Sequence, residues 1–67
     1  MYKGLFSNGM RNGMGKNYFS NGALEYKGCF VDELFSGEGT YYWENGFKMY
    51  QGFFLKGKFH GRGKLYN

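Results

Sequence analysis

The chain repeats itself every 24 residues, and this period constrains its fold more than any other feature. When the copies are aligned, all 13 glycines fall into five columns, and tyrosine and phenylalanine also recur at fixed positions. A fixed period of this length indicates small supersecondary units that bury their apolar faces only by stacking on one another. We therefore expect one repeat domain over 1–67, with repeat 1 at 1–25, repeat 2 at 26–49 and a partial repeat 3 at 50–67.

The glycine columns favour strands over helices. Each glycine inside a helix costs about 1 kcal/mol relative to alanine, and the residues between the glycines are often aromatic or β-branched, as in strands. Asn-Gly pairs such as Asn21-Gly22 suit tight hairpin turns. We expect strands near 2–7, 13–19, 26–31, 37–43, 50–55 and 61–66. The predicted fold class is all-β, a single twisted antiparallel meander of tandem β-hairpins with about six strands.

Each repeat opens with an aromatic–glycine–aromatic pattern on alternate residues. The three triplets are Tyr2, Gly4 and Phe6; Tyr26, Gly28 and Phe30; and Tyr50, Gly52 and Phe54. Alternate residues of a strand share one face, and a ring from the next strand or repeat can cover the bare glycine. We expect a ladder of rings on one face of the sheet, and this ladder is the predicted core.

The opposite face is unusually apolar for a sheet that has only one layer. It is expected to carry Leu5, Cys29, Val31, Phe53 and Leu55. Such a face should be polar if it meets water, and a meander also leaves two edge strands that recruit other strands. These five residues are therefore a candidate protein interface, for a protein partner or a second copy of the chain.

The net charge of +4 is unevenly distributed, with +2 in repeat 1, −2 in repeat 2 and +4 in repeat 3. The cations of repeat 3 are Lys56, Lys58, Arg62 and Lys64. A basic end attracts phosphates or anionic lipid, so these four are candidate anion or lipid contacts. Nucleic acid is a weaker expectation, because the rings occupy the columns that build the sheet and repeat 2 is net acidic.

No catalytic, cofactor or metal site is expected. Residues 52–58 match part of a phosphate-binding loop, but Phe59 stands where that motif needs a hydroxyl residue. His60 aligns with small polar residues of a turn, and Cys29 lies in an apolar column. The single cysteine excludes an internal disulfide, and no apolar run approaches the roughly 20 residues of a membrane span. We expect a cytoplasmic protein.

The recurring pattern Y-x-G-x-F, then G-x-G, then a turn ending in N-G resembles the membrane occupation and recognition nexus (MORN) repeat. The clearest copy contains Tyr50-Gln51-Gly52-Phe53-Phe54, Lys56-Gly57-Lys58 and His60-Gly61-Arg62-Gly63. The resemblance covers the whole chain as two full copies and a partial third. It implies one β-hairpin per repeat and a non-catalytic scaffold, dimerisation module or membrane tether, and some members are credited with binding acidic phosphoinositides.

Two departures from the family pattern bear on these expectations. Glu33 replaces the turn glycine of the other copies, so we expect its hairpin to turn differently. The second position of the repeat, often acidic in the family, is Lys3, Lys27 and Gln51, which favours anions. The leading hypothesis is a non-enzymatic protein-association module, with self-association included. The alternative is peripheral binding to anionic phospholipid at the cytosolic face of a membrane, through repeat 3.

Overall fold

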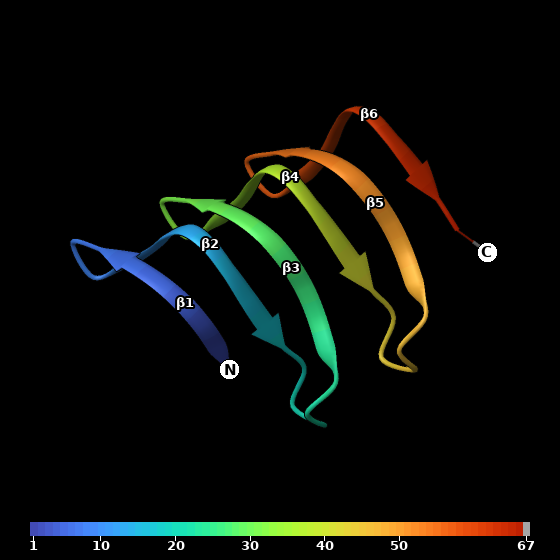
Figure 1. The fold of residues 1–67 in the computed structure, drawn as a ribbon, viewed down its shortest axis with the longest axis horizontal. Coiled ribbons are helices and arrows are strands. Elements are labelled where there is room, and N and C mark those ends of the chain that lie inside the picture. The colour runs from blue at the N-terminus through green and yellow to red at the C-terminus, as the bar shows by residue number, and fades with distance from the viewer. Residues whose placement is uncertain (67) are drawn as a thin grey trace.

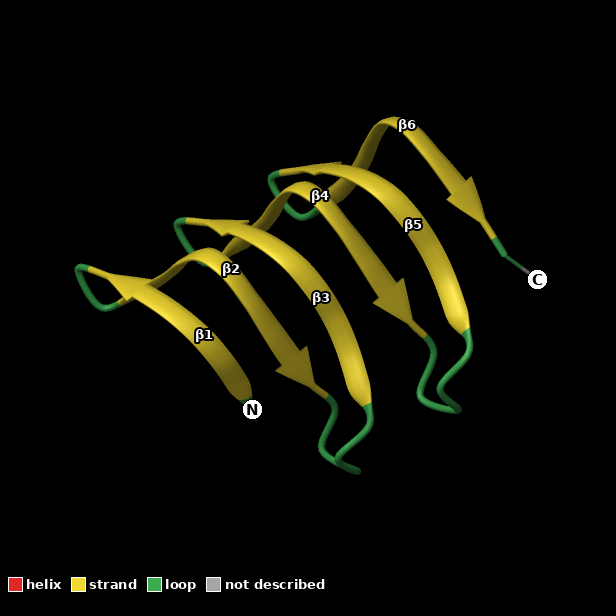
Figure 2. Ribbon diagram, viewed as in Figure 1, coloured by secondary structure: helices red, strands yellow, loops and turns green. Residues whose placement is uncertain are grey.

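The computed structural model describes residues 1–66 and forms one antiparallel sheet (Figure 1). Its strands are β1 (Tyr2–Ser7), β2 (Met10–Tyr18), β3 (Leu24–Val31), β4 (Leu34–Tyr42), β5 (Lys48–Leu55) and β6 (Lys58–Leu65). Each strand pairs with the next one along the chain, in the order β1 to β6. Figure 2 shows strands joined by loops, with no helix among the described residues. The predicted meander of hairpins is confirmed.

The second strand of each hairpin is longer than predicted. These strands begin at Met10, Leu34 and Lys58 rather than at the glycines of the 13, 37 and 61 column. Those glycines lie inside the strands, where they adopt positive φ values of 83°, 81° and 66°. The pairing within each hairpin also shifts register beside them. Because glycine adopts positive φ without steric cost, this column bends a strand where we had expected the strand to start.

The hairpin tips are two-residue turns, and the expectation for Glu33 is wrong. Asp32 and Glu33 have φ values of 47° and 75°, close to the 53° and 77° of Asn8 and Gly9. The turn is the same although glycine is absent. Arg11 compensates for the strained backbone, since its backbone N–H and its Nε both donate to the Glu33 carboxylate, at 3.1 and 2.5 Å.

The other Asn-Gly pairs do not form tight two-residue turns. Asn21-Gly22 lies in the longer loop 19–23, where Gly22 N donates to Phe19 O at 3.0 Å. The Asn21 side chain accepts from the backbone N–H of Ala23 at 2.9 Å. Only the glycine of the pair has a positive φ, 89°. The loop 43–47 repeats the arrangement, so the asparagine acts there through its side chain rather than through an unusual backbone.

The predicted ladder of rings forms the core. Phe30 and Tyr26 are 1% and 0% exposed, and Phe54 and Tyr50 are 3% and 4% exposed. Edge-to-face contacts at centroid separations of 5.0–5.2 Å run through Phe6, Tyr2, Phe30, Tyr26, Phe54 and Tyr50. Edge-to-face geometry is favourable for aromatic pairs beyond the burial of their area. The rings of all three repeats therefore form one continuous structure.

The recurring spacing of the glycines makes room for the tyrosine rings. Gly28 and Gly39 face each other across β3 and β4, and Tyr26 lies over both, donating its hydroxyl to Cys29 O at 2.8 Å. A Cβ on Gly28 would lie 2.5 Å from Gly39 Cα, and a Cβ on Gly39 would overlap the Tyr26 ring. Gly39 is the second glycine of its pair, and the ring that covers it comes from the neighbouring strand, as predicted. For the first glycine it comes from the same strand.

Successive repeats are also joined at the hairpin tips. Glu33 N donates to Arg11 O at 3.0 Å, and one repeat later Gly57 N donates to Phe35 O at 2.9 Å. The tip of each later hairpin thus reaches back to the second strand of the preceding one. The resulting sheet has extents of 37 × 30 × 13 Å, so it is wide in two dimensions and one layer thick.

Candidate interaction surfaces

The five residues of the predicted protein interface lie opposite the ring ladder. They alternate with the ladder residues along β1, β3 and β5, and alternate residues of a strand face opposite ways. The members are Leu5, Cys29, Val31, Phe53 and Leu55, which we call the outer apolar face. Four of them are 45–61% exposed, and Cys29 is half-buried. Apolar side chains on this face therefore meet solvent in all three repeats.

The structure divides the outer apolar face into separate groups. Cys29 pairs with Met14 across β2 and β3, and its thiol donates to the Met14 sulfur at 3.2 Å. Val31 and Leu55 line one hollow of about 220 Å³ together with Leu34. Sequence reasoning missed Met14 and Leu34, although Leu34 follows directly after a predicted turn.

Phe53 is set apart from Cys29 by an acidic neighbour. It pairs with Glu38 of β4, the strand that lies between β3 and β5. A carboxylate therefore stands in the row of apolar side chains. A protein that covers this face must therefore meet separate apolar groups with a carboxylate among them.

The four candidate anion contacts of repeat 3 are all exposed, but they do not converge on one site. Lys56 belongs to the tip between β5 and β6, and Lys58 begins β6. Lys64 is six residues further along the strand, a span of up to about 20 Å at 3.3 Å per residue. Its ammonium lies 5.2 Å from the centre of the Tyr66 ring. The four cations form a line along the edge strand rather than a pocket.

A second group of cations appears only once the strands are in register. Lys3 pairs with Lys16, and Lys16 pairs with Lys27, so three lysines stand in a row across β1, β2 and β3. They line a shallow hollow of about 600 Å³. Like charges directly opposite one another destabilise a sheet. Sequence reasoning noted Lys3 and Lys27 but could not place Lys16 between them.

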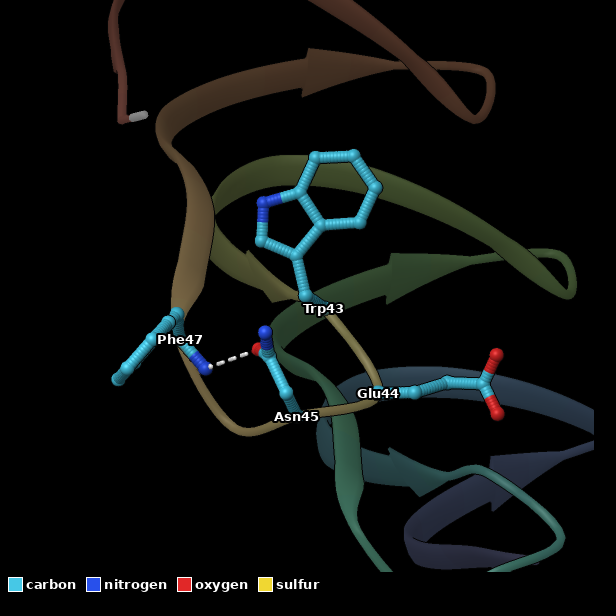
Figure 3. Close-up of a pocket in the computed structure, with 4 residues that line it drawn as sticks. All are labelled: Trp43, Glu44, Asn45 and Phe47. Carbon is cyan, nitrogen blue, oxygen red and sulfur yellow. Dashed lines mark hydrogen bonds between the residues drawn. The ribbon is translucent and has the colours of Figure 1, made fainter.

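The loop 43–47 carries two exposed rings at the margin of the sheet. Trp43 is 47% exposed and Phe47 is 71% exposed. Figure 3 shows them with Glu44 and Asn45 around an open hollow of about 390 Å³, with the Asn45 side chain accepting from Phe47 N at 3.0 Å. This hydrogen bond fixes the conformation of the loop. Among the described residues, Glu44 and Asn45 are the polar ones that line the hollow.

Among the described residues, two tyrosines and one glutamate have shifted pKa values. Burial, followed by the hydrogen bond to Glu25, raises the pKa of Tyr41 to about 12. Burial also raises the pKa of Tyr26, while the bond from Arg11 lowers the pKa of Glu33. These shifts follow from core packing and from the hairpin tip.

Three further observations concern features outside these surfaces. Within residues 1–66, no three side chains among histidine, cysteine, aspartate and glutamate gather as metal ligands. The part of the chain resembling a phosphate-binding loop runs from β5 through a hairpin turn into β6, whereas such a loop must open a helix. The described part of the chain contains no helix of the length and hydropathy that a bilayer span requires.

Comparison with known proteins identifies one family. The family model of the MORN repeat matches the chain three times, at residues 2–24, 26–48 and 50–67. No curated protein and no solved structure matches the chain. The three matches begin at the three tyrosines that lie over the paired glycines.

Proposed function

The chain belongs to the MORN repeat family, and we propose that it is a non-catalytic module that associates with another protein chain, including a second copy of itself. The observation that carries this proposal is the exposed outer apolar face. One face of the sheet holds the whole core, and the other presents Leu5, Phe53 and Leu55 to solvent. Covering apolar surface contributes about 2.5 kcal/mol per 100 Å², before the entropic cost of association is subtracted.

Substitutions on the outer apolar face test the proposal. We expect the wild-type chain to show a mass above one chain by light scattering at high concentration, with a melting temperature that rises with concentration. Phe53→Ser with Leu55→Ser should lower that mass. Phe47→Ser is the matched control, because Phe47 is more exposed than either residue and lies in a loop.

Two results would oppose the proposal. The first is a mass of one chain at every concentration, with a melt that does not depend on concentration. The second is an equal loss of mass in the Phe47→Ser control, which would indicate nonspecific hydrophobic association rather than association through a defined face.

A second candidate function is peripheral binding to anionic phospholipid at the cytosolic face of a membrane. It is supported by the line of exposed cations along the edge, for which no ion pair occurs among the described residues. Co-sedimentation with phosphoinositide vesicles should weaken steeply with salt and with Lys56→Glu plus Lys58→Glu. Lys3→Glu plus Lys27→Glu makes the same change of charge in the second group of cations, and it should weaken binding less than the pair in repeat 3. Binding that survives the first pair of substitutions would exclude this function.

A further inference from the structure

The contact between successive repeats occurs twice in the structure and has three parts. β2 pairs with β3 and β4 pairs with β5, each in antiparallel register. A tip N–H donates back to the preceding repeat, as from Gly57 to Phe35 O at 2.9 Å. A phenylalanine of the later repeat packs on a tyrosine of the earlier one, as Phe54 does on Tyr26 at 5.1 Å. We call this contact the repeat joint.

The two edges of the sheet carry the two halves of another repeat joint. On the β6 side, Phe59 occupies the column of Phe35 and is 47% exposed. On the β1 side, Phe6 occupies the column of Phe30 and Phe54 and is 61% exposed, whereas Phe54 inside a joint is 3% exposed. The atoms at the two edges that correspond to Phe35 O and Gly57 N are Phe59 O and Gly9 N. Among the described residues, neither of them forms a hydrogen bond between a hairpin tip and a strand of another repeat.

The backbone of both edges is also oriented for pairing. Tyr18 N donates to Met1 O, and Tyr66 N donates to Met49 O. Because bonding directions alternate along an antiparallel strand, the N–H and C=O groups of the neighbouring residue Leu65 point away from the sheet. The same alternation turns the backbone groups of Tyr2 and Gly4 outward from β1.

We propose that copies of this chain add end to end, with β6 of one copy pairing with β1 of the next in the register of the repeat joint. This inference rests on the proposed function in taking association as its premise, but it uses the edges rather than the outer apolar face. Column by column, Gly63 lies opposite Gly4 of the next copy, Leu65 opposite Tyr2, and Lys64 opposite Lys3. Phe6 of the next copy covers Phe59.

The joint between copies is weaker than the joint within a chain. It is one strand wide, whereas stable interfaces bury at least roughly 1,200 Å², so we expect association only at high protein concentration. Lys64 opposite Lys3 is a like-charge pair, which opposes pairing. Such an interface uses different surfaces on its two sides, so it builds an open chain of copies unless the rotation between copies closes a ring. Six strands at about 4.8 Å give a rise of about 29 Å per copy.

A charge-reversal cycle tests this arrangement by sedimentation equilibrium of the 67-residue chain. Lys64→Glu alone, or Lys3→Glu alone, turns the like pair into an opposite pair, and we expect association about threefold to tenfold tighter at low salt. The double variant restores a like pair and should return to the wild-type level. Higher salt should strengthen association of the wild type and weaken that of either single variant.

The double variant separates edge pairing from a general effect of charge. The two substitutions lower the net charge from +4 to 0, so any association limited only by overall repulsion becomes tighter still. A double variant that associates more tightly than the single variants therefore overturns the proposal. So does the absence of association in all four proteins.

A proline on the edge provides an independent arm. Leu65→Pro removes an outward N–H and costs no bond inside the sheet, as edge strands allow, and we expect association more than about tenfold weaker. Leu65→Thr is the control for the lost side chain. If Leu65→Pro associates normally and Phe53→Ser does not, end-to-end addition is wrong and the proposed function stands. The reverse result removes the outer apolar face from the proposal and keeps the joint.

Discussion

Gly39→Ala should be among the most damaging small changes in this chain. Gly39 does not have a positive φ, so an alanine there strains no backbone and would ordinarily stabilise the fold by about 0.4–1 kcal/mol through the unfolded state. The added Cβ, however, would overlap the ring of Tyr26. Tyr26 is 0% exposed and lies 3.9 Å from Phe35 in a stacked pair, so the ring has no free direction in which to move.

The expected loss of stability in Gly39→Ala follows from the interactions that Tyr26 would lose. Its hydroxyl bond to Cys29 O contributes about 1 kcal/mol, each disturbed ring pair about 0.5–1.5 kcal/mol, and overpacking itself typically costs about 1–3 kcal/mol. We therefore expect Gly39→Ala to lower the free energy of unfolding by about 3–5 kcal/mol. A domain of this length has roughly 3–10 kcal/mol in total, so most of its stability would be lost.

Urea unfolding followed by circular dichroism and by Trp43 fluorescence measures this change. A stabilising osmolyte in the buffer keeps enough of the variant folded for the folded baseline of its unfolding curve to be measured. Gly15→Ala is the matched control, since its Cβ would overlap Tyr2 in the same way. Tyr2 is only half-buried and lies at the edge of the sheet, so its ring can swing outward and the cost should be about 1–2 kcal/mol.

A double variant checks that the ring is the cause. Tyr26→Phe removes the hydroxyl oxygen, the atom nearest to the added Cβ, so Gly39→Ala should cost about 1 kcal/mol less in the Tyr26→Phe background. The steric explanation is refuted if Gly39→Ala stays within about 0.5 kcal/mol of the wild type. Equal costs for Gly39→Ala and Gly15→Ala would refute it as well.

Three further predictions concern the tips, the core tyrosines and the loops. Arg11→Phe with Glu33→Gly recreates the residues of the next repeat and should keep the wild-type melting temperature, whereas Arg11→Phe alone should lower it. Burial raises the pKa of Tyr26 and Tyr41, so the contribution of these two tyrosines to stability should be constant below about pH 9 and fall at higher pH, because the unfolded chain ionises first near the ordinary tyrosine pKa of about 10; Tyr41→Phe should reduce that slope in alkaline urea titrations. Asn45→Ala removes the acceptor for a backbone N–H two residues on, and should cost about 1 kcal/mol in the same unfolding assay.

The ladder of rings could be predicted from the sequence, but the pairing register of the strands could not. Alternation of Tyr26, Gly28 and Phe30 placed the rings on one face, because β3 pairs with β2 over those residues without a register shift. Alternation fails at Gly37, where a positive φ and a register shift bend β4. Glycine alone does not distinguish such a bend from a turn, because it marks both.

The hairpin at Glu33 could not be predicted from its own neighbourhood. The residue that stabilises its backbone is Arg11, which is 22 positions away. Likewise, the row of lysines required the pairing of Lys16 with both Lys3 and Lys27. Both features depend on contacts between strands, and a reading of one strand at a time contains no information about them.

The two margins of the sheet differ in what they allow an engineer to change. The loops 19–23 and 43–47 bond only within themselves, as Phe19 N does to Ala23 O and Trp43 N to Phe47 O. The tips at Glu33 and Gly57 bond to the repeat before them. Guest peptides or extra residues should therefore be accepted in the loops, whereas lengthening a tip would uncouple adjacent modules. A display scaffold built from this chain should carry its cargo on the loop margin alone.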